Sequence, residues 1–158
     1  MYLKRIGTTA LGVLLITLLV ASLVVPVASP YAGANQSLPA VLPKIDEEHI
    51  FEGELNAKGK LVGFHHMGKY TDRILKITRQ PNKYGVYEAE FRAFGQTKKS
   101  TFFPDRWSRQ KVLDSIYEAY FNPVNKSRNA RVGKTTDGLR VKMYLDQEGN
   151  IATAFPLY

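Results

Sequence analysis

The chain is 158 residues long and contains no cysteine, which excludes disulfide scaffolds, thiolate nucleophiles, lipobox acylation and cysteine-ligated zinc sites. Its formal charge is +8, and this falls to +6 if the two basic residues near the N-terminus are removed by processing. A basic balance favours an anionic partner, such as nucleic acid, an anionic envelope polymer or a membrane surface. Many exported proteins are basic without such a partner, so charge supports nucleic acid only weakly.

Residues 1–34 have the pattern of a secretory signal peptide. A basic start is followed by an apolar run from Ala10 to Val25 and by small residues that end at Ala34, where we expect cleavage. The apolar run is at the lower limit for crossing a bilayer, so an uncleaved membrane anchor is the alternative. In both cases the rest of the chain is expected outside, as a secreted or extracellular protein that has no stable membrane partner once the signal is cleaved.

Residues 35–44 carry two prolines and show no periodic hydrophobic pattern, which predicts a linker. We expect residues 45–158 to form one domain. Within it, residues 72–79 and 84–94 alternate apolar and polar side chains as half-buried strands do. Residues 100–104 are a short β-branched and aromatic run that ends at a proline. We expect strands in all three segments.

The second half of the domain contains one clear helix. Ser108 is the expected N-cap, apolar residues then recur at helical spacing, and Asn122 with the proline after it ends the pattern. Residues 125–138 are predicted to be a polar loop, and residues 139–145 and 151–155 a closing hairpin. These elements predict an α+β fold with mostly antiparallel sheets and one principal helix before the final hairpin.

Without disulfides, the domain depends on packing alone. On the strand at 84–94, alternation places Tyr87, Ala89 and Phe91 on one face. The large side chains expected in the core are Phe91, Phe102, Trp107, Ile116 and Tyr120.

Several familiar motifs are absent or incomplete. The run GKTT at 133–136 lacks the glycine that a phosphate-binding loop requires five positions before Gly133, because Arg128 stands there. No G-x-S-x-G or H-E-x-x-H pattern occurs. His65 and His66 are adjacent, so on a strand they point to opposite faces and cannot chelate one metal ion together. We therefore expect no metal site.

The three histidines of the chain are His49, His65 and His66, and all lie in segments flanked by glycines. Lysines in the run TKKST precede the aromatic strand. Two imidazoles and one fixed ammonium suit phosphodiester transfer to a neighbouring ribose hydroxyl: one imidazole removes the 2′-hydroxyl proton, the other protonates the leaving 5′-oxygen, and the ammonium stabilises the phosphorane. Imidazole is suitable because its ordinary pKa, about 6.5, leaves both protonation states available. The alternative is that these histidines only make structural hydrogen bonds.

At this point a family resemblance adds to the chemistry. Spanning about residues 47–158, the chain contains EHIFEGELNAKGKLVGFHHMG, YGVYEAEF, KKSTFFPDRWSRQKVLDSIYEAY and TTDGLRVKMYLDQEGNIATAFPLY. In this order the segments resemble the bacterial EndoU nuclease domain, which is related to the uridylate-specific endoribonucleases of animals and coronaviruses. The STFFP block and the ending are the most specific parts. The resemblance implies two β-sheets with helices packed around them.

The resemblance also implies roles for individual residues. His49 in HIFEGE would be the general acid, and His65 in VGFH, rather than its neighbour, the general base. Lys99 is favoured as the catalytic lysine over Lys98 because it directly precedes the STFFP block. Thr153 and Phe155 would form the base pocket. Animal and viral relatives have tyrosine at the second of these positions, and phenylalanine can stack on a base but cannot donate a hydrogen bond.

The resulting hypothesis is a secreted endoribonuclease. It would cleave single-stranded RNA 3′ of a pyrimidine, with uridine the expected base, and leave a 2′,3′-cyclic phosphate without a metal ion or other cofactor. One alternative is a toxin with the same chemistry and a cognate immunity protein as a partner. Another is a non-catalytic basic module that binds the envelope, although the presence of both histidine sites and the lysine argues against it.

Overall fold

The computed structural model describes residues 41–127 and 129–158. The predicted signal peptide or anchor at 1–34 lies outside these residues, and so does most of the predicted linker, so both stay predictions. Within the described ranges, no helix is long and apolar enough to cross a membrane. In chain order the elements are α1 (Glu47–Phe51), β1 (Glu54–Leu55), β2 (Leu61–Val62), η1 (Thr71–Arg73), β3 (Ile74–Arg79), β4 (Tyr87–Ala93), β5 (Gln96–Phe102), α2 (Arg109–Phe121), β6 (Pro123–Lys126), β7 (Ala130–Lys134), β8 (Arg140–Leu145) and β9 (Ile151–Pro156).

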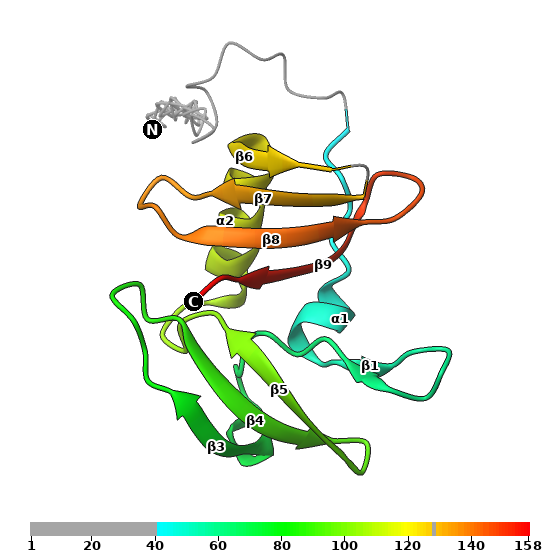
Figure 1. Ribbon diagram of the computed structural model, residues 1–158, viewed down its shortest axis with the longest axis vertical. Coiled ribbons are helices and arrows are strands. Elements are labelled where there is room, and N and C mark those ends of the chain that lie inside the picture. The colour runs from blue at the N-terminus through cyan, green and yellow to red at the C-terminus, as the bar shows by residue number, and fades with distance from the viewer. Residues whose placement is uncertain (1–40, 128) are drawn as a thin grey trace, which may run out of the picture. The chain divides into compact units, whose positions relative to one another are not determined.

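The predicted α+β class is confirmed. The strands form three sheets with the orders β1-β2, β3-β4-β5 and β6-β7-β8-β9, and every strand pair within them is antiparallel. The principal helix, α2, packs on the four-stranded sheet (Figure 1). Strand β9 lies beside β5, so the edges of the two larger sheets meet (Figure 1).

The expected start of α2 is confirmed, since the Oγ of Ser108 accepts a hydrogen bond from the backbone N of Lys111 at 3.1 Å. The predicted loop at 125–138 is wrong, because half of it forms the end of β6 and all of β7. Gly133 lies within the predicted loop but is a strand residue, and a Cβ there would lie 1.7 Å from the carbonyl oxygen of Ala119. A glycine in this strand lets the sheet approach α2 closely.

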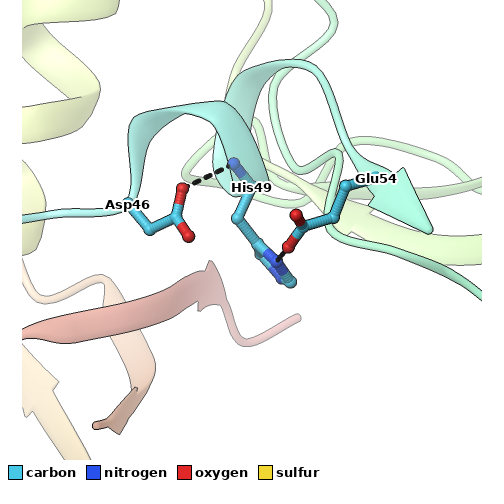
Figure 2. A group of neighbouring side chains, drawn as sticks. All are labelled: Asp46, His49 and Glu54. Atoms are coloured by element: carbon cyan, nitrogen blue, oxygen red, sulfur yellow. Dashed lines mark hydrogen bonds and ion pairs between the residues drawn. The ribbon is translucent and has the colours of Figure 1, made fainter. Parts of the chain in front are cut away.

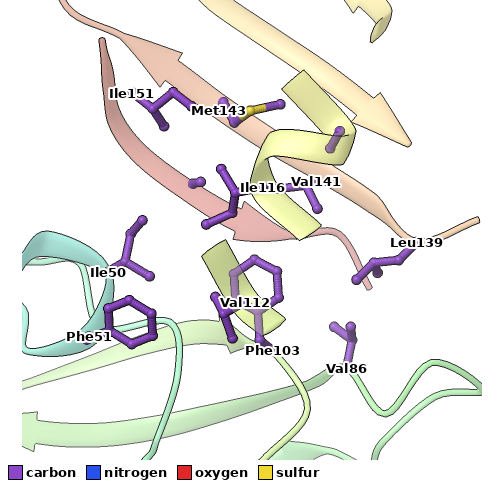
Figure 3. Packing of buried hydrophobic residues seen from close by; sticks show 12 residues of the cluster. Ile50, Phe51, Val86, Phe103, Val112, Ile116, Leu139, Val141, Met143 and Ile151 are labelled. Atoms are coloured by element: carbon purple, nitrogen blue, oxygen red, sulfur yellow. The ribbon is translucent and has the colours of Figure 1, made fainter. Parts of the chain in front are cut away.

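Two clusters of buried side chains hold the domain together. The larger one lies between α2, the four-stranded sheet and α1, and Figure 3 shows Val112 and Ile116 of the helix among its buried side chains. The smaller one lies on the three-stranded sheet and contains Phe64, Tyr87, Ala89, Phe91 and Phe102.

The expected core is partly confirmed. Phe91, Phe102 and Ile116 are fully buried, and Tyr87, Ala89 and Phe91 do share the buried face of β4. The prediction is wrong for Trp107 and Tyr120, which are only partly buried at the margin of the larger cluster. Each lies beneath a cation, with the Lys111 ammonium 5.3 Å from the Trp107 ring and the Arg131 guanidinium 4.2 Å from the Tyr120 ring. Aromatic side chains at a core margin can combine apolar packing with such contacts.

The close approach at Gly133 gives a prediction about stability. We expect Gly133→Ala to lower the free energy of unfolding by about 1 to 3 kcal/mol, because the new methyl group meets backbone that cannot rotate away. Urea denaturation monitored by circular dichroism measures the change. Gly149→Ala is the comparison, since its site is open but its φ is +87°, and it should cost only about 1 kcal/mol of backbone strain. A Gly133→Ala protein as stable as the wild type would show that α2 can move away from β7.

Candidate active site

A cavity of about 410 Å³ lies where α1, β2, β5 and β9 meet. We call it the two-histidine cavity. All five residues that the sequence analysis assigned to the site line it, namely His49, His65, Lys99, Thr153 and Phe155, together with Val62, Gly63, Lys98, Ser100 and Thr101. Residues far apart in the sequence therefore meet in one concave site of the size that holds small ligands.

His49 is positioned by two carboxylates, as Figure 2 shows. The Oδ1 of Asp46 accepts a hydrogen bond from the backbone N of His49 at 3.0 Å and so caps α1. The ring Nδ1 lies 2.8 Å from Oε1 of Glu54. A carboxylate only accepts, so this bond places a proton on Nδ1 and leaves Nε2 for proton transfer.

The segment that carries His65 is folded back onto α1 by two residues in the left-handed conformation. Gly63 has φ +73° and Phe64 has φ +62°. The backbone N of Phe64 donates to the carbonyl of His49 at 2.8 Å, and that of His65 donates to the carbonyl of Ile50 at 2.7 Å. A Cβ at position 63 would lie 2.0 Å from the His49 carbonyl oxygen, so only glycine fits. This contact brings the ring centroids of His49 and His65 to 6.4 Å from each other.

The ring of His65 is held neutral. Its Nδ1 lies 3.0 Å from the carbonyl oxygen of Thr101, which can only accept, so Nδ1 carries the hydrogen and Nε2 has a free lone pair. Phe155 stacks on the ring at 5.2 Å. Burial lowers the pKa of His65 to about 3, and the nearby charges of Lys98 and His49 act in the same direction, whereas the Thr101 carbonyl opposes them.

His66 does not reach the two-histidine cavity. It lines a separate cavity and meets the ring of Phe51 edge-on at 5.8 Å. The alternation of side chains along an extended segment, which the sequence analysis used to separate the two neighbours, therefore places only His65 beside His49.

The two lysines of β5 differ in what they contact. The Nζ of Lys98 donates to the carbonyl of Gly63 at 3.0 Å and to the Oγ of Ser100 at 3.1 Å, and burial lowers its pKa. The Nζ of Lys99 lies 2.7 Å from Oε2 of Glu88, and its side chain is 53% exposed. Both line the cavity, but the structure holds Lys98, and not the lysine that the sequence favoured, against the segment that carries His65. The sequence could not decide between neighbours because strand register sets their faces.

Thr153 and Phe155 occupy alternate positions of β9, so they share one face of the strand. Both are partly buried, and the Phe155 ring also lies 6.4 Å from that of Tyr144 on β8. A hydroxyl and an aromatic ring therefore lie together on the part of the cavity wall that β9 forms.

One group of side chains that the sequence analysis missed has the ligand types of a metal site. Asp46, His49 and Glu54 each offer one ligand atom, and these atoms lie within 4.8 Å of one another (Figure 2). In the sequence, this group is visible only as acidic residues on both sides of His49, a pattern that is also typical of a helix start. A cation bound to Nδ1 of His49 would replace its hydrogen bond to Glu54, so metal binding and the positioned imidazole compete for one nitrogen.

Comparison with known proteins finds one family and one relative. The family model described as "Bacterial EndoU nuclease" matches residues 44–158. A protein of Bacillus cereus named "Toxin" is 38% identical over 117 residues, which are 69% of this chain and 22% of that protein. The chain thus corresponds to less than a quarter of this relative's length. No solved structure matches the chain significantly.

The buried, neutral His65 predicts how stability depends on pH. The unfolded chain protonates this imidazole near pH 6.5, whereas the folded protein does so only near pH 3. The unfolded state therefore holds more protons between these values, and stability falls as the pH is lowered from 6.5, with a limiting slope of about 1.4 kcal/mol per pH unit. His65→Asn should reduce this slope in urea denaturation series between pH 7 and 4.

Burial also lowers the pKa of His66, so His66 adds to the slope in the wild type and in His65→Asn alike. The difference between these two proteins therefore isolates His65. Lys58→Ala, which changes an exposed ammonium, should retain the full slope. Parallel curves for the wild type and His65→Asn would show that His65 takes up a proton in the folded protein as readily as in the unfolded chain.

Proposed function

The chain belongs to the bacterial EndoU nuclease family, and from this premise we propose that it cuts single-stranded RNA 3′ of a pyrimidine, preferring uridine, and leaves a 2′,3′-cyclic phosphate. The observation that carries the proposal is the pair of imidazoles with centroids 6.4 Å apart and an ammonium beside them in one cavity. Transfer to a neighbouring hydroxyl needs a base, an acid and a cation, and this cavity offers all three.

The surroundings of the imidazoles suggest which one is the base. The Nε2 of His65 has a free lone pair and would take the proton from the ribose 2′-hydroxyl, whose oxygen then attacks phosphorus. The imidazole of His49, positioned by Glu54, would in its protonated form give its proton to the leaving 5′-oxygen. The bond from phosphorus to the 5′-oxygen breaks, and the products are a 2′,3′-cyclic phosphate and a 5′-hydroxyl. Neutralising the acid and protonating the base leaves the net charge of the protein unchanged.

A bound phosphodiester would also bring the pKa of His65 closer to the working range of a base. In the empty cavity, burial and the positive charge of Lys98 disfavour its protonated form. The negative charge of the phosphate would favour that form in both imidazoles. The substrate itself would thus tune the base, and efficient proton transfer is expected only in the complex.

We assign the stabilising ammonium to Lys98 and not to Lys99. The Lys98 amine is fixed by the carbonyl of Gly63 and the hydroxyl of Ser100, so its charge stays in place as the phosphorane forms. Lys99 is more exposed and already neutralised by Glu88. No step of this mechanism uses a metal ion, and activity is proposed to persist in chelator.

The proposal predicts a ranking of variants. With a fluorescent single-stranded RNA containing one uridine, in the presence of EDTA, we expect His49→Ala, His65→Ala and Lys98→Ala each to lower kcat/KM by about 10²-fold or more. His66→Ala and Lys99→Ala are the matched controls and should cost less than about tenfold. The same strand with 2′-deoxy or 2′-O-methyl uridine should stay intact because it lacks the nucleophile.

Two outcomes would contradict specific parts of this proposal. Loss of activity in Lys99→Ala with retention in Lys98→Ala would return the catalytic role to Lys99. Absence of cleavage in EDTA, restored by a divalent cation, would move the chemistry toward the carboxylates around His49.

The base pocket is assigned to Thr153 and Phe155. The Thr153 hydroxyl can bond a base carbonyl and the Phe155 ring can stack on the base, from one face of β9. We expect Thr153→Ala to reduce discrimination between uridine and the other bases by about tenfold while slowing uridine cleavage less. Single-stranded substrates that carry one cleavable nucleotide, with each of the four bases in turn, measure this. An equal loss on all four bases would remove Thr153 from recognition.

The relative named a toxin supports a second, biological proposal. We propose that this domain is the nuclease of a toxin, that an immunity protein protects the producing cell, and that export by residues 1–34 takes it outside. Family membership argues against the non-catalytic envelope-binding alternative.

A further inference from the structure

A second cavity, of about 310 Å³, lies on the other side of the segment that carries the two neighbouring histidines. We call it the His66 cavity. Four of its lining residues are aromatic, namely Phe51, His66, Tyr70 and Trp107. Because His65 and His66 are consecutive, one stretch of backbone separates this cavity from the proposed catalytic one. The proposed mechanism uses nothing in it.

His66 is a polar group that packing alone does not explain. The residue is only 4% exposed, and its Nε2 is buried without a hydrogen-bond partner in the described part of the chain. Burial also lowers the pKa of the ring, although the charge of Asp105 and the backbone groups of Trp107 and Pro104 act in the opposite direction, so the ring is neutral. A buried polar atom without a partner costs free energy that an apolar residue here would avoid. Gly68 lies close to the other ring nitrogen, since a Cβ at this glycine would lie 3.6 Å from Nδ1 of His66.

The cavity also carries two carboxylates with spare acceptor capacity. Asp105 accepts from the hydroxyl of Tyr87 through Oδ1 at 2.7 Å, which leaves its second oxygen. The carboxylate of Glu52 has no hydrogen bond or ion pair to any residue within 41–127 or 129–158, although the backbone carbonyl of Glu52 accepts from Arg73. Acceptors of this kind bind the exocyclic amino groups of bases, as Glu and Asp do with cytosine.

Two cations complete the wall. The guanidinium of Arg109 lies 4.0 Å over the Phe51 ring and is held by Glu47 at 2.8 Å, and the Lys69 ammonium lies 5.0 Å over the Tyr70 ring. Their charges suit the phosphate that accompanies a base in RNA. Aromatic rings with carboxylates and cations around them match single-stranded RNA recognition, in which unstacked bases lie on aromatic or guanidinium planes and are bonded along their edges.

We propose that the His66 cavity binds the base of a nucleotide neighbouring the cleaved one, and that it selects bases with an exocyclic amino group. Guanine, adenine and cytosine can donate such a group to Glu52 or Asp105, whereas uracil cannot. The inference rests on the proposed function, because the neighbour belongs to the same RNA strand. A free mononucleotide has the same chemistry, and the experiment separates the two sources.

Trp107 gives a readout of binding that does not require catalysis, since it is the sole tryptophan of the chain and lines this cavity. The titration uses His65→Ala protein and 2′-O-methyl oligonucleotides, GUG against UUU, with guanosine monophosphate as the third ligand. We expect GUG to quench Trp107 emission at an at least fivefold lower concentration than UUU does. A response to guanosine monophosphate as strong as that to GUG would overturn the assignment to an RNA neighbour and indicate a free-nucleotide site.

The variant Glu52→Gln tests the contact itself. It keeps the size of the side chain and the backbone bond to Arg73, and it should weaken GUG binding about fivefold or more without changing UUU, which is the lower end of what a base-edge contact supplies. Glu90→Gln on β4 removes the same charge from a side chain outside the cavity and should leave both affinities unchanged. Equal binding of GUG and UUU, or an unaltered Glu52→Gln protein, would overturn the proposal.

Cleavage assays distinguish a failure of this inference from a failure of the proposed function. Wild-type protein should cut a single uridine between guanines at least about fivefold faster than one between uridines, and Glu52→Gln should remove the difference. Cleavage at equal rates in both contexts would overturn the neighbour site while leaving the nuclease in place. Selective quenching of Trp107 by GUG without cleavage of any RNA would support the site and remove the nuclease proposal.

Discussion

The site depends on one backbone contact, the approach of Gly63 to the carbonyl of His49. Two left-handed residues in succession turn the chain so that its next amides donate to α1, and Phe64 adopts this conformation although it is not glycine. The strain of such a residue is offset by burial of its ring among Phe91 and Phe102, at centroid distances of 4.8 and 5.4 Å. Packing in the smaller core thus holds together two imidazoles that lie 16 positions apart.

The two imidazoles meet but have different surroundings, and this difference supports different roles. Nδ1 of His49 lies 2.8 Å from the carboxylate of Glu54, whereas burial and the stacked Phe155 surround His65 with apolar groups that favour its neutral form. In both rings a hydrogen bond fixes Nδ1 and leaves Nε2 for chemistry. The proposed roles of acid and base for the two imidazoles rest on this difference in surroundings.

Much of the fold was predictable where local signals agreed. The Ser108 cap, the alternation in β4 and the closing hairpin each combine a residue preference with a pattern of burial. Prediction failed where a residue served a distant contact. Gly133 looks like a loop residue, but the close approach of α2 requires it in β7, and the orientation of Lys98 depends on how β5 pairs with β4.

The sequence by itself determined the composition of the site and the class of the fold. It contains two glycine-flanked histidine segments, a lysine pair before an aromatic strand, and the family pattern over nearly the whole domain. Only the tertiary structure decided that His65 and not His66 lies in the cavity and which contacts distinguish Lys98 from Lys99, and it grouped Asp46 and Glu54 around His49. The physical reason is that adjacent side chains on extended backbone differ by half a turn, and the face that becomes buried is set by contacts with residues far along the chain.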